Sequence, residues 1–139
     1  MKALTLTQPW ATLVAIGAKE IETRSWHTSY RGPLAIHAAK GLAGMKRIEF
    51  SQLCLLTEPF RTALRAAGYY DSDSFPRGRV LATCELVDCL ETQAIEVGEP
   101  ERSFGDYSYG RFAWLLENIR RLPGPVPAKG ALGLWEWQP

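Results

Sequence analysis

The sequence predicts an α+β fold in which several short strands form a small closed or nearly closed β-barrel with helices at its periphery. Two observations lead to this prediction. Short strand-like runs occur along most of the chain, whereas helical spacing is confined to segments between the first few of them. No unit repeats at a fixed period, which argues against a solenoid or a propeller.

Length and composition favour one domain with its own core. The chain has 139 residues, of which 46% are hydrophobic, so we treat residues 1–139 as a single domain that needs neither metal nor disulfide staples. Sixteen basic residues face 15 acidic ones, which gives a formal net charge of +1. This balance argues against a protein that binds nucleic-acid duplexes non-specifically along their length. The composition excludes disorder for most of the chain.

Cysteine usage and hydropathy indicate the compartment. Three cysteines, Cys54, Cys84 and Cys89, form an odd set without Cys-x-x-Cys spacing, and only two histidines accompany them. We therefore expect a reduced intracellular protein with no metal ion and no cofactor. The N-terminal residues do not resemble a signal peptide, and polar residues interrupt every long hydrophobic run. We expect a soluble cytoplasmic protein that does not bind membranes.

The first part of the chain contains a helix among strands. Helical spacing begins at Trp10, after Thr7 with its capping hydroxyl and Pro9, which suits a first helical turn. Gly17 can adopt the left-handed conformation that ends a helix. Strand patterns surround this helix at residues 2–7, 20–26 and 34–40.

The rest of the chain is predicted as helices followed by strands. Residues 41–68 have a helical pattern that Pro59 should divide into two helices, and residues 69–77 form a polar loop. The acidic segment 91–108 is either a mobile lid over a pocket or an idle loop, and residues 122–127 form a stiff proline-rich connection. Three further strands are expected at residues 79–90, 109–119 and 131–137.

The strand at residues 79–90 carries an unusual carboxylate. Alternation places Cys84 on the face of the apolar residues Val80, Ala82 and Leu86, and places Glu85 on the other face. A regular strand would also put Cys84 and Cys89 on opposite faces.

Residues 17–24 concentrate two cations and two carboxylates between a helix end and a strand. Such charges can be solvated residues of an edge strand, or they can converge in a cavity. The two-residue period of a strand puts Glu22, Arg24 and Trp26 on one side, so a carboxylate, a guanidinium and an indole could line one nucleobase pocket.

Four other residues are candidates for the same pocket. Gln8 and Trp10 are neighbours at the start of the first helix, although the spacing of Trp10 also suits a buried helix face. His37 is either a cleft-facing base or a hydrogen-bonded residue of a crowded barrel. Lys40, at a strand end, is either solvated or in contact with a phosphate.

The sequence resembles the ASCH domain family, which is related to the PUA superfamily of RNA-binding barrels. The resemblance lies in Gly-x-Lys-x-x-Glu-x-Arg, at Gly17, Lys19, Glu22 and Arg24, and extends to residues 30–40 and 127–135. It implies a PUA-like β-barrel with a cleft between the barrel and the N-terminal helix. Family members are thought to bind RNA or nucleotides in that cleft.

Some members of this family resemble enzymes. One bacterial branch hydrolyses the acetyl amide of acetylated cytidine with a Lys, a Thr and a Glu, and another member is similar to a ribonuclease. Lys19 matches the lysine, and Glu85 is the strand carboxylate that we pair with it. Glu22 stands where that branch has its threonine, which removes the hydroxyl nucleophile of the amidohydrolase reaction. From the motif match and the strand carboxylate we expect Lys19, Glu22, Arg24 and Glu85 to converge on one cleft.

Three functions therefore follow from the sequence. The first is binding of RNA, a nucleotide or a modified nucleoside. The second is hydrolysis of a modified nucleoside or of RNA, with Lys19 and Glu85 as an acid–base pair and Glu22 beside them. The third is a protein-interaction module.

Overall fold

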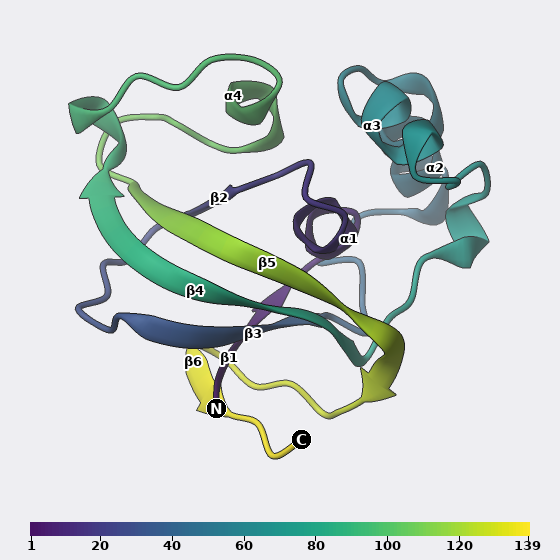
Figure 1. Ribbon diagram of the computed structural model, residues 1–139. Coiled ribbons are helices and arrows are strands. Elements are labelled where there is room, and N and C mark those ends of the chain that lie inside the picture. Colours follow the sequence, from purple (N-terminus) through teal and green to yellow (C-terminus); the bar gives the residue numbers. More distant parts are fainter.

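Six strands and four α-helices make up the computed structural model, which describes residues 1–139 (Figure 1). In chain order they are β1 (Lys2–Leu6), α1 (Trp10–Ala15), β2 (Ile21–Arg24), β3 (Gly32–Ala38), α2 (Arg47–Leu56), α3 (Phe60–Ala66), β4 (Arg79–Glu91), α4 (Glu101–Phe104), β5 (Phe112–Pro127) and β6 (Leu134–Glu136). Two single 3₁₀ turns, Ser72–Ser74 and Thr92–Ala94, precede β4 and α4. The predicted helix break at Pro59 is confirmed.

All six strands belong to one curled sheet of order β2-β5-β4-β3-β1-β6. Only the pair β1 and β3 is parallel. The first strand therefore lies between β3 and the last strand, and both chain ends lie at the same side of the molecule (Figure 1). The sheet forms a half-barrel whose edge strands, β2 and β6, do not pair with each other. The predicted α+β architecture is confirmed.

Helix α1 fills the inside of the curl. Its residues Ala11, Val14 and Ala15 pack in one buried cluster with residues of β1, β3, β4 and β5 (Figure 1). On the other side of the helix, Leu13 joins a second cluster formed mainly by α2, α3 and the loop before β4. Because α1 is held from both sides, its first residue, Trp10, has a fixed position beside β2.

The start of α1 differs from the prediction in how it is capped. Pro9 occupies the N-cap position and the Thr7 hydroxyl makes no capping bond. The buried side chain of Gln8 takes that role, because its Oε1 accepts from the backbone N–H of Thr12 at 2.9 Å. Its Nε2 donates to the carbonyl of Pro76 at 2.7 Å, which ties the helix start to the segment before β4. As predicted, the chain leaves the helix at Gly17, with φ of +80°.

The proline-rich connection predicted at residues 122–127 is wrong, because β5 continues through it to Pro127. Pro123 and Pro125 lie within residues 122–125, which have no partner on β4, because the register shifts between Val80, opposite Val126, and Ala82, opposite Arg121. Ala128 donates its N–H to the carbonyl of Gly78, just before β4, so the ring nitrogen of the preceding Pro127 faces away from β4. On the other side of β5, β2 pairs only with Phe112–Leu115, so the three prolines cost no sheet hydrogen bond.

Candidate functional site

Two cations and a carboxylate form a continuous ion-pair chain beside the end of α1. The Lys19 ammonium, which is fully buried, lies 3.0 Å from Oε1 of Glu22 and also donates to the carbonyl of Ile21. The other oxygen of Glu22 accepts from Nη1 of Arg24 at 3.1 Å. Both oxygens of Glu22 are therefore occupied by cations, and the guanidinium of Arg24 is held in one orientation.

Local backbone structure puts these three residues together. After Gly17, the backbone N–H groups of Ala18 and Lys19 both bond to the carbonyl of Leu13, which turns the chain back toward the sheet. The Glu101 carboxylate then accepts from the N–H groups of Glu20 and Ile21, at 2.8 and 3.1 Å, where β2 begins.

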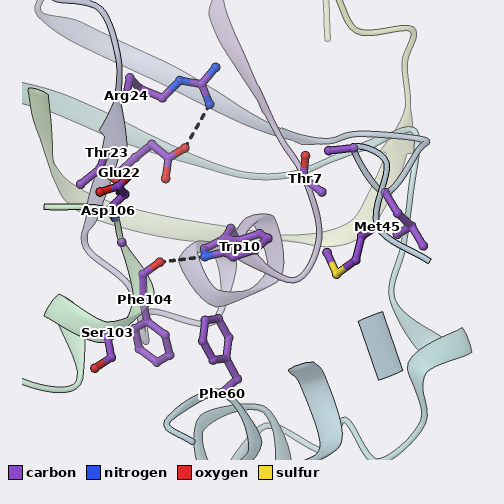
Figure 2. Close-up of a pocket in the computed structure, with 13 residues that line it drawn as sticks. Thr7, Trp10, Glu22, Thr23, Arg24, Met45, Phe60, Ser103, Phe104 and Asp106 are labelled. Carbon is purple, nitrogen blue, oxygen red and sulfur yellow. Dashed lines mark hydrogen bonds and ion pairs between the residues drawn. The ribbon is translucent and has the colours of Figure 1, made fainter. Parts of the chain in front are cut away.

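A cavity of about 450 Å³ opens where the ion pairs of Glu22 and Arg24 meet the start of α1. We call it the motif cavity. Figure 2 shows Arg24 and Glu22 of β2 bonded to each other beside it, and Trp10 bonded to Phe104. Its walls come from five separate segments of the chain and are formed by Thr7, Trp10, Glu22, Thr23, Arg24, Leu42, Ala43, Met45, Phe60, Ser103, Phe104, Gly105 and Asp106.

Three aromatic side chains give the cavity an apolar wall. The Trp10 indole N–H donates to the carbonyl of Phe104 at 2.7 Å, which fixes the plane of the ring. Phe60 packs edge-on against Trp10, with ring centroids 5.9 Å apart, and against Phe104 at 5.2 Å. A flat ligand could therefore bind between an apolar wall and the guanidinium of Arg24.

The segment predicted as a lid or an idle loop supplies one wall of the cavity. The N–H of Asp106 donates to the hydroxyl of Thr23 at 2.9 Å, and Phe104 is buried. Gly105 has no room for a side chain, since an added Cβ would lie 3.1 Å from the Thr23 methyl and 2.8 Å from the Tyr107 ring. The hydroxyl of Tyr107 is buried without a hydrogen-bond partner, and burial raises its pKa.

A model of the ASCH domain matches residues 4–124 of the chain. The chain belongs to the ASCH domain family. Activating signal cointegrator 1 of Mus musculus is 32% identical over 133 residues and that of Homo sapiens is 29% identical. These matches cover 96% of this chain but 22% of each relative, so the chain spans about a fifth of their length. A solved structure of a mutant ZmASCH protein from Zymomonas mobilis is 12% identical, with a TM-score of 0.48, over 91% of this chain and 74% of that one.

The ASCH motif residues are brought together by the structure, but only some of them reach the cavity. Glu22 and Arg24 line it, and so does Trp10. Lys19 is buried behind Glu22 and holds it in place. Trp26 lies beyond the end of β2 and packs edge-on against Trp114 at 4.8 Å instead of lining the cavity.

The expected pairing of Lys19 with Glu85 is not formed. Glu85 lies between Cys84 and Leu86, whose side chains are both in the core inside the curl, so its own side chain faces the outside of the sheet. Its partner across the sheet is the exposed Glu117. Glu22 faces the inside, next to the buried Trp114, so the sheet separates the two carboxylates.

The other predicted residues lie elsewhere in the ASCH domain. Gln8 caps α1 and does not line the motif cavity. His37 and Lys40 line a second cavity, which is separate from the first. No group of three or more His, Cys, Asp or Glu residues is placed to hold a metal ion, and no helix is long and apolar enough to cross a membrane.

Sequence reasoning missed the residues that complete the cavity. The sequence pattern places Met45 and Phe60 in the helical region and Ser103 to Asp106 in a loop, whereas all of them line the cavity. No local pattern shows that these segments meet. The tightly packed Gly105 is the one signal in the sequence, because a glycine between Phe104 and Asp106 allows close approach of the backbone.

The partly buried carboxylate of Glu101 predicts a pH dependence of stability. Burial raises the pKa of Glu101 above its usual value of 4.5, although two backbone N–H groups bond to it. The folded protein therefore holds this proton more tightly than the unfolded chain, so the stabilising contribution is complete below pH 4.5 and is lost as the pH rises through the raised pKa. We expect Glu101→Gln to remove this fall in the free energy of unfolding.

Urea denaturation at closely spaced pH values from 4.5 to neutral measures the effect. Glu58→Gln is the control, because hydrogen bonds from Thr62 lower the pKa of Glu58, and its contribution is lost only as the pH falls below 4.5. A Glu101→Gln protein with the same fall in stability as the parent would assign this pH dependence to another group.

Proposed function

We propose that this ASCH domain binds RNA, a nucleotide or a modified nucleoside, with one base in the motif cavity. The observation that carries the proposal is an arginine held by a carboxylate opposite an aromatic wall, in a cavity between the sheet and the N-terminal helix. Membership of the ASCH family supports it, since binding of RNA or nucleotides is what the resemblance implies.

The size and lining of the cavity suit such a ligand. Small-molecule sites usually have volumes of about 300–1,000 Å³ and combine an apolar lining with a few polar groups. At about 450 Å³, with Trp10, Phe60 and Phe104 on one wall, the motif cavity falls in this range. Each base stacked on an aromatic ring contributes about 1–3 kcal/mol to binding.

Arg24 is the residue to which we assign recognition. Its guanidinium can donate two parallel hydrogen bonds to a phosphate or to a base edge. Glu22 uses one side of that group, and the side chain remains 25% exposed, so donors stay available for a ligand. Because Glu22 already fixes the orientation, little side-chain entropy is lost on binding.

Hydrolysis is not assigned to Lys19. Its ammonium is enclosed by Glu22 and the carbonyl of Ile21, and it does not line the motif cavity. A ligand in that cavity would therefore contact Glu22 and Arg24 but not Lys19.

Incubation with a panel of modified nucleosides, nucleotides and short RNAs, followed by mass spectrometry, reports retention and turnover in the same samples. Retention of none of them would contradict the proposal, and a released product would show hydrolysis.

We expect Arg24→Ala to weaken binding of the retained ligand by about 1–3 kcal/mol, or roughly 5- to 150-fold. The fold should survive, because Glu22 keeps its bond to Lys19. Arg31→Ala is the control, since Arg31 forms a comparable ion pair with Asp88 outside the motif cavity. Titrations and thermal melts of both variants test this. If Arg24→Ala melts early while binding per folded molecule is unchanged, Arg24 serves only the fold.

A further inference from the structure

A second and larger cavity lies at the end of β3. Its volume is about 970 Å³, and its walls come from the end of β3, the start of β4 and the loop after β5. We call it the basic pocket because its four charged residues are Lys40, Arg77, Arg79 and Lys129.

The charge of the basic pocket is unbalanced. All four cations are exposed, none of them forms an ion pair, and no carboxylate lines the walls. The whole chain has a formal net charge of only +1, so this one surface concentrates positive charge that is compensated elsewhere. A concave surface lined by charges of one sign attracts ligands of the opposite sign.

His37 holds the loop that carries Lys129 by a hydrogen bond and by close packing. This histidine is buried, and its Nε2 lies 2.8 Å from the carbonyl of Ala128, which can only accept, so Nε2 donates. Its Nδ1 lies 3.1 Å from the hydroxyl of Thr5, which accepts from the indole of Trp135. Gly130 passes so close that an added Cβ would lie 2.7 Å from the His37 ring. The position of Lys129 is thus set by packing against β1 and β3.

The basic pocket is connected to the motif cavity along the surface. Ala39 and Lys40 line the basic pocket, and a few residues later Leu42 lines the motif cavity. A small depression shares Arg77 with the first and Leu42 with the second, and the ion pair of Arg47 with Asp73 also lines it. One extended ligand could therefore reach both cavities.

We propose that the basic pocket binds the phosphodiester backbone of a single nucleic-acid strand, one nucleotide of which occupies the motif cavity. The inference rests on the proposed function and makes it more specific, because the ligand is then a strand and not an isolated nucleoside. Backbone contacts by lysine and arginine carry affinity and not sequence selectivity. The motif cavity selects a base, and the basic pocket holds the strand that carries it.

The test is fluorescence anisotropy with labelled ligands of three lengths, a mononucleotide, a trinucleotide and a dodecanucleotide. Each is made as RNA and as DNA, with the same sequence. Each phosphate neutralised on a single strand contributes about −0.7 to the slope of log affinity against log salt concentration. Four contacts predict a slope of about −2.8 for the parent protein and about −1.4 for the double variant Lys40→Gln, Lys129→Gln. The RNA and DNA arms identify which backbone is preferred.

We expect the double variant to bind the dodecanucleotide at least about 10-fold more weakly than the parent at low salt and to bind the mononucleotide equally well. A second double variant, Arg77→Gln with Arg79→Gln, should show the same loss of dodecanucleotide binding and the same mononucleotide binding. It replaces the first double variant if that one does not fold. The control pair, Arg65→Gln with Arg120→Gln, removes two exposed cations that also lack ion pairs and lie outside the basic pocket.

The outcomes separate this proposal from the proposed function. Parent-like binding of the dodecanucleotide by both pocket variants, with an unchanged salt slope, would overturn the role of the basic pocket. An equal loss in the control pair would show that net charge alone is responsible and would overturn it too. If Arg24→Ala leaves mononucleotide binding unchanged, the motif cavity is not the base site and the proposed function fails, whatever the basic pocket does.

Discussion

Replacing Lys19 by methionine is expected to lower the free energy of unfolding by about 3–5 kcal/mol. Lys19 is fully buried, and its ammonium neutralises one oxygen of Glu22, which is itself buried. Methionine fills similar space but leaves that oxygen without a donor in a largely buried site. Burying a charge without its partner is among the most destabilising changes in a protein.

The same substitution at Lys2 is the matched control. Lys2 also pairs with a glutamate, Glu136 at 2.9 Å, but both side chains are largely exposed. Exposed ion pairs contribute little, so Lys2→Met should leave the urea midpoint almost unchanged. Equal losses in the two variants would show that Glu22 is compensated by Arg24 alone. The double variant Lys19→Met, Glu22→Gln should regain part of the stability, because it also removes the uncompensated charge.

Trp114→Ala is the second change with a large expected effect, a loss of about 3–5 kcal/mol in the free energy of unfolding. The Trp114 side chain is completely buried, and Trp26 packs edge-on against it. Removing the ring leaves a cavity in the main core cluster, next to Glu22 on the neighbouring strand β2. Urea denaturation should show a lower midpoint with an unchanged slope.

Trp135→Ala provides the comparison. Trp135 also belongs to a strand, but β6 is an edge strand and the indole is only partly buried there, beside His37. Its truncation should therefore lose less stability than that of Trp114. A larger loss for Trp135→Ala would mean that closure of the last strand, and not the core under α1, dominates stability.

The sequence predicted those features that depend on neighbours in the chain. The two-residue period of a strand placed Glu22 and Arg24 on one side, and both line the same cavity. Gly17 marked the end of α1, and Pro59 marked the break between α2 and α3. Each of these depends on local backbone geometry, which a few residues determine.

The misplaced Glu85 shows where local reasoning ends. Alternation separated Glu85 from Cys84 correctly but could not show which side of the sheet residues 17–24 would occupy. Cys89 makes the same point, because a register shift between Leu86 and Asp88 places Cys89 in the same core as Cys84, although a regular strand would not. Such bulges depend on how β4 bends around the core.

The walls of the motif cavity could not be predicted for a related reason. Trp10, Leu42, Phe60 and Phe104 come from four segments separated by many residues, and each looks like an ordinary core residue in its own segment. Only the tertiary fold brings them to Arg24. The basic pocket is similar, since its cations come from three separate segments, at Lys40, at Arg77 with Arg79, and at Lys129.

The position of β1 between β3 and β6 has a consequence for how the chain reaches this fold during translation. Residues 2–6 are synthesised long before residues 134–136, one of their two partners, and the bond between Thr5 and Trp135 spans 130 residues. Contacts of such high order form late, because a long loop must close before they contribute. The nascent chain therefore carries β1 with one edge uncovered until residues 134–136 have been synthesised, which exposes this strand to wrong pairing with another chain.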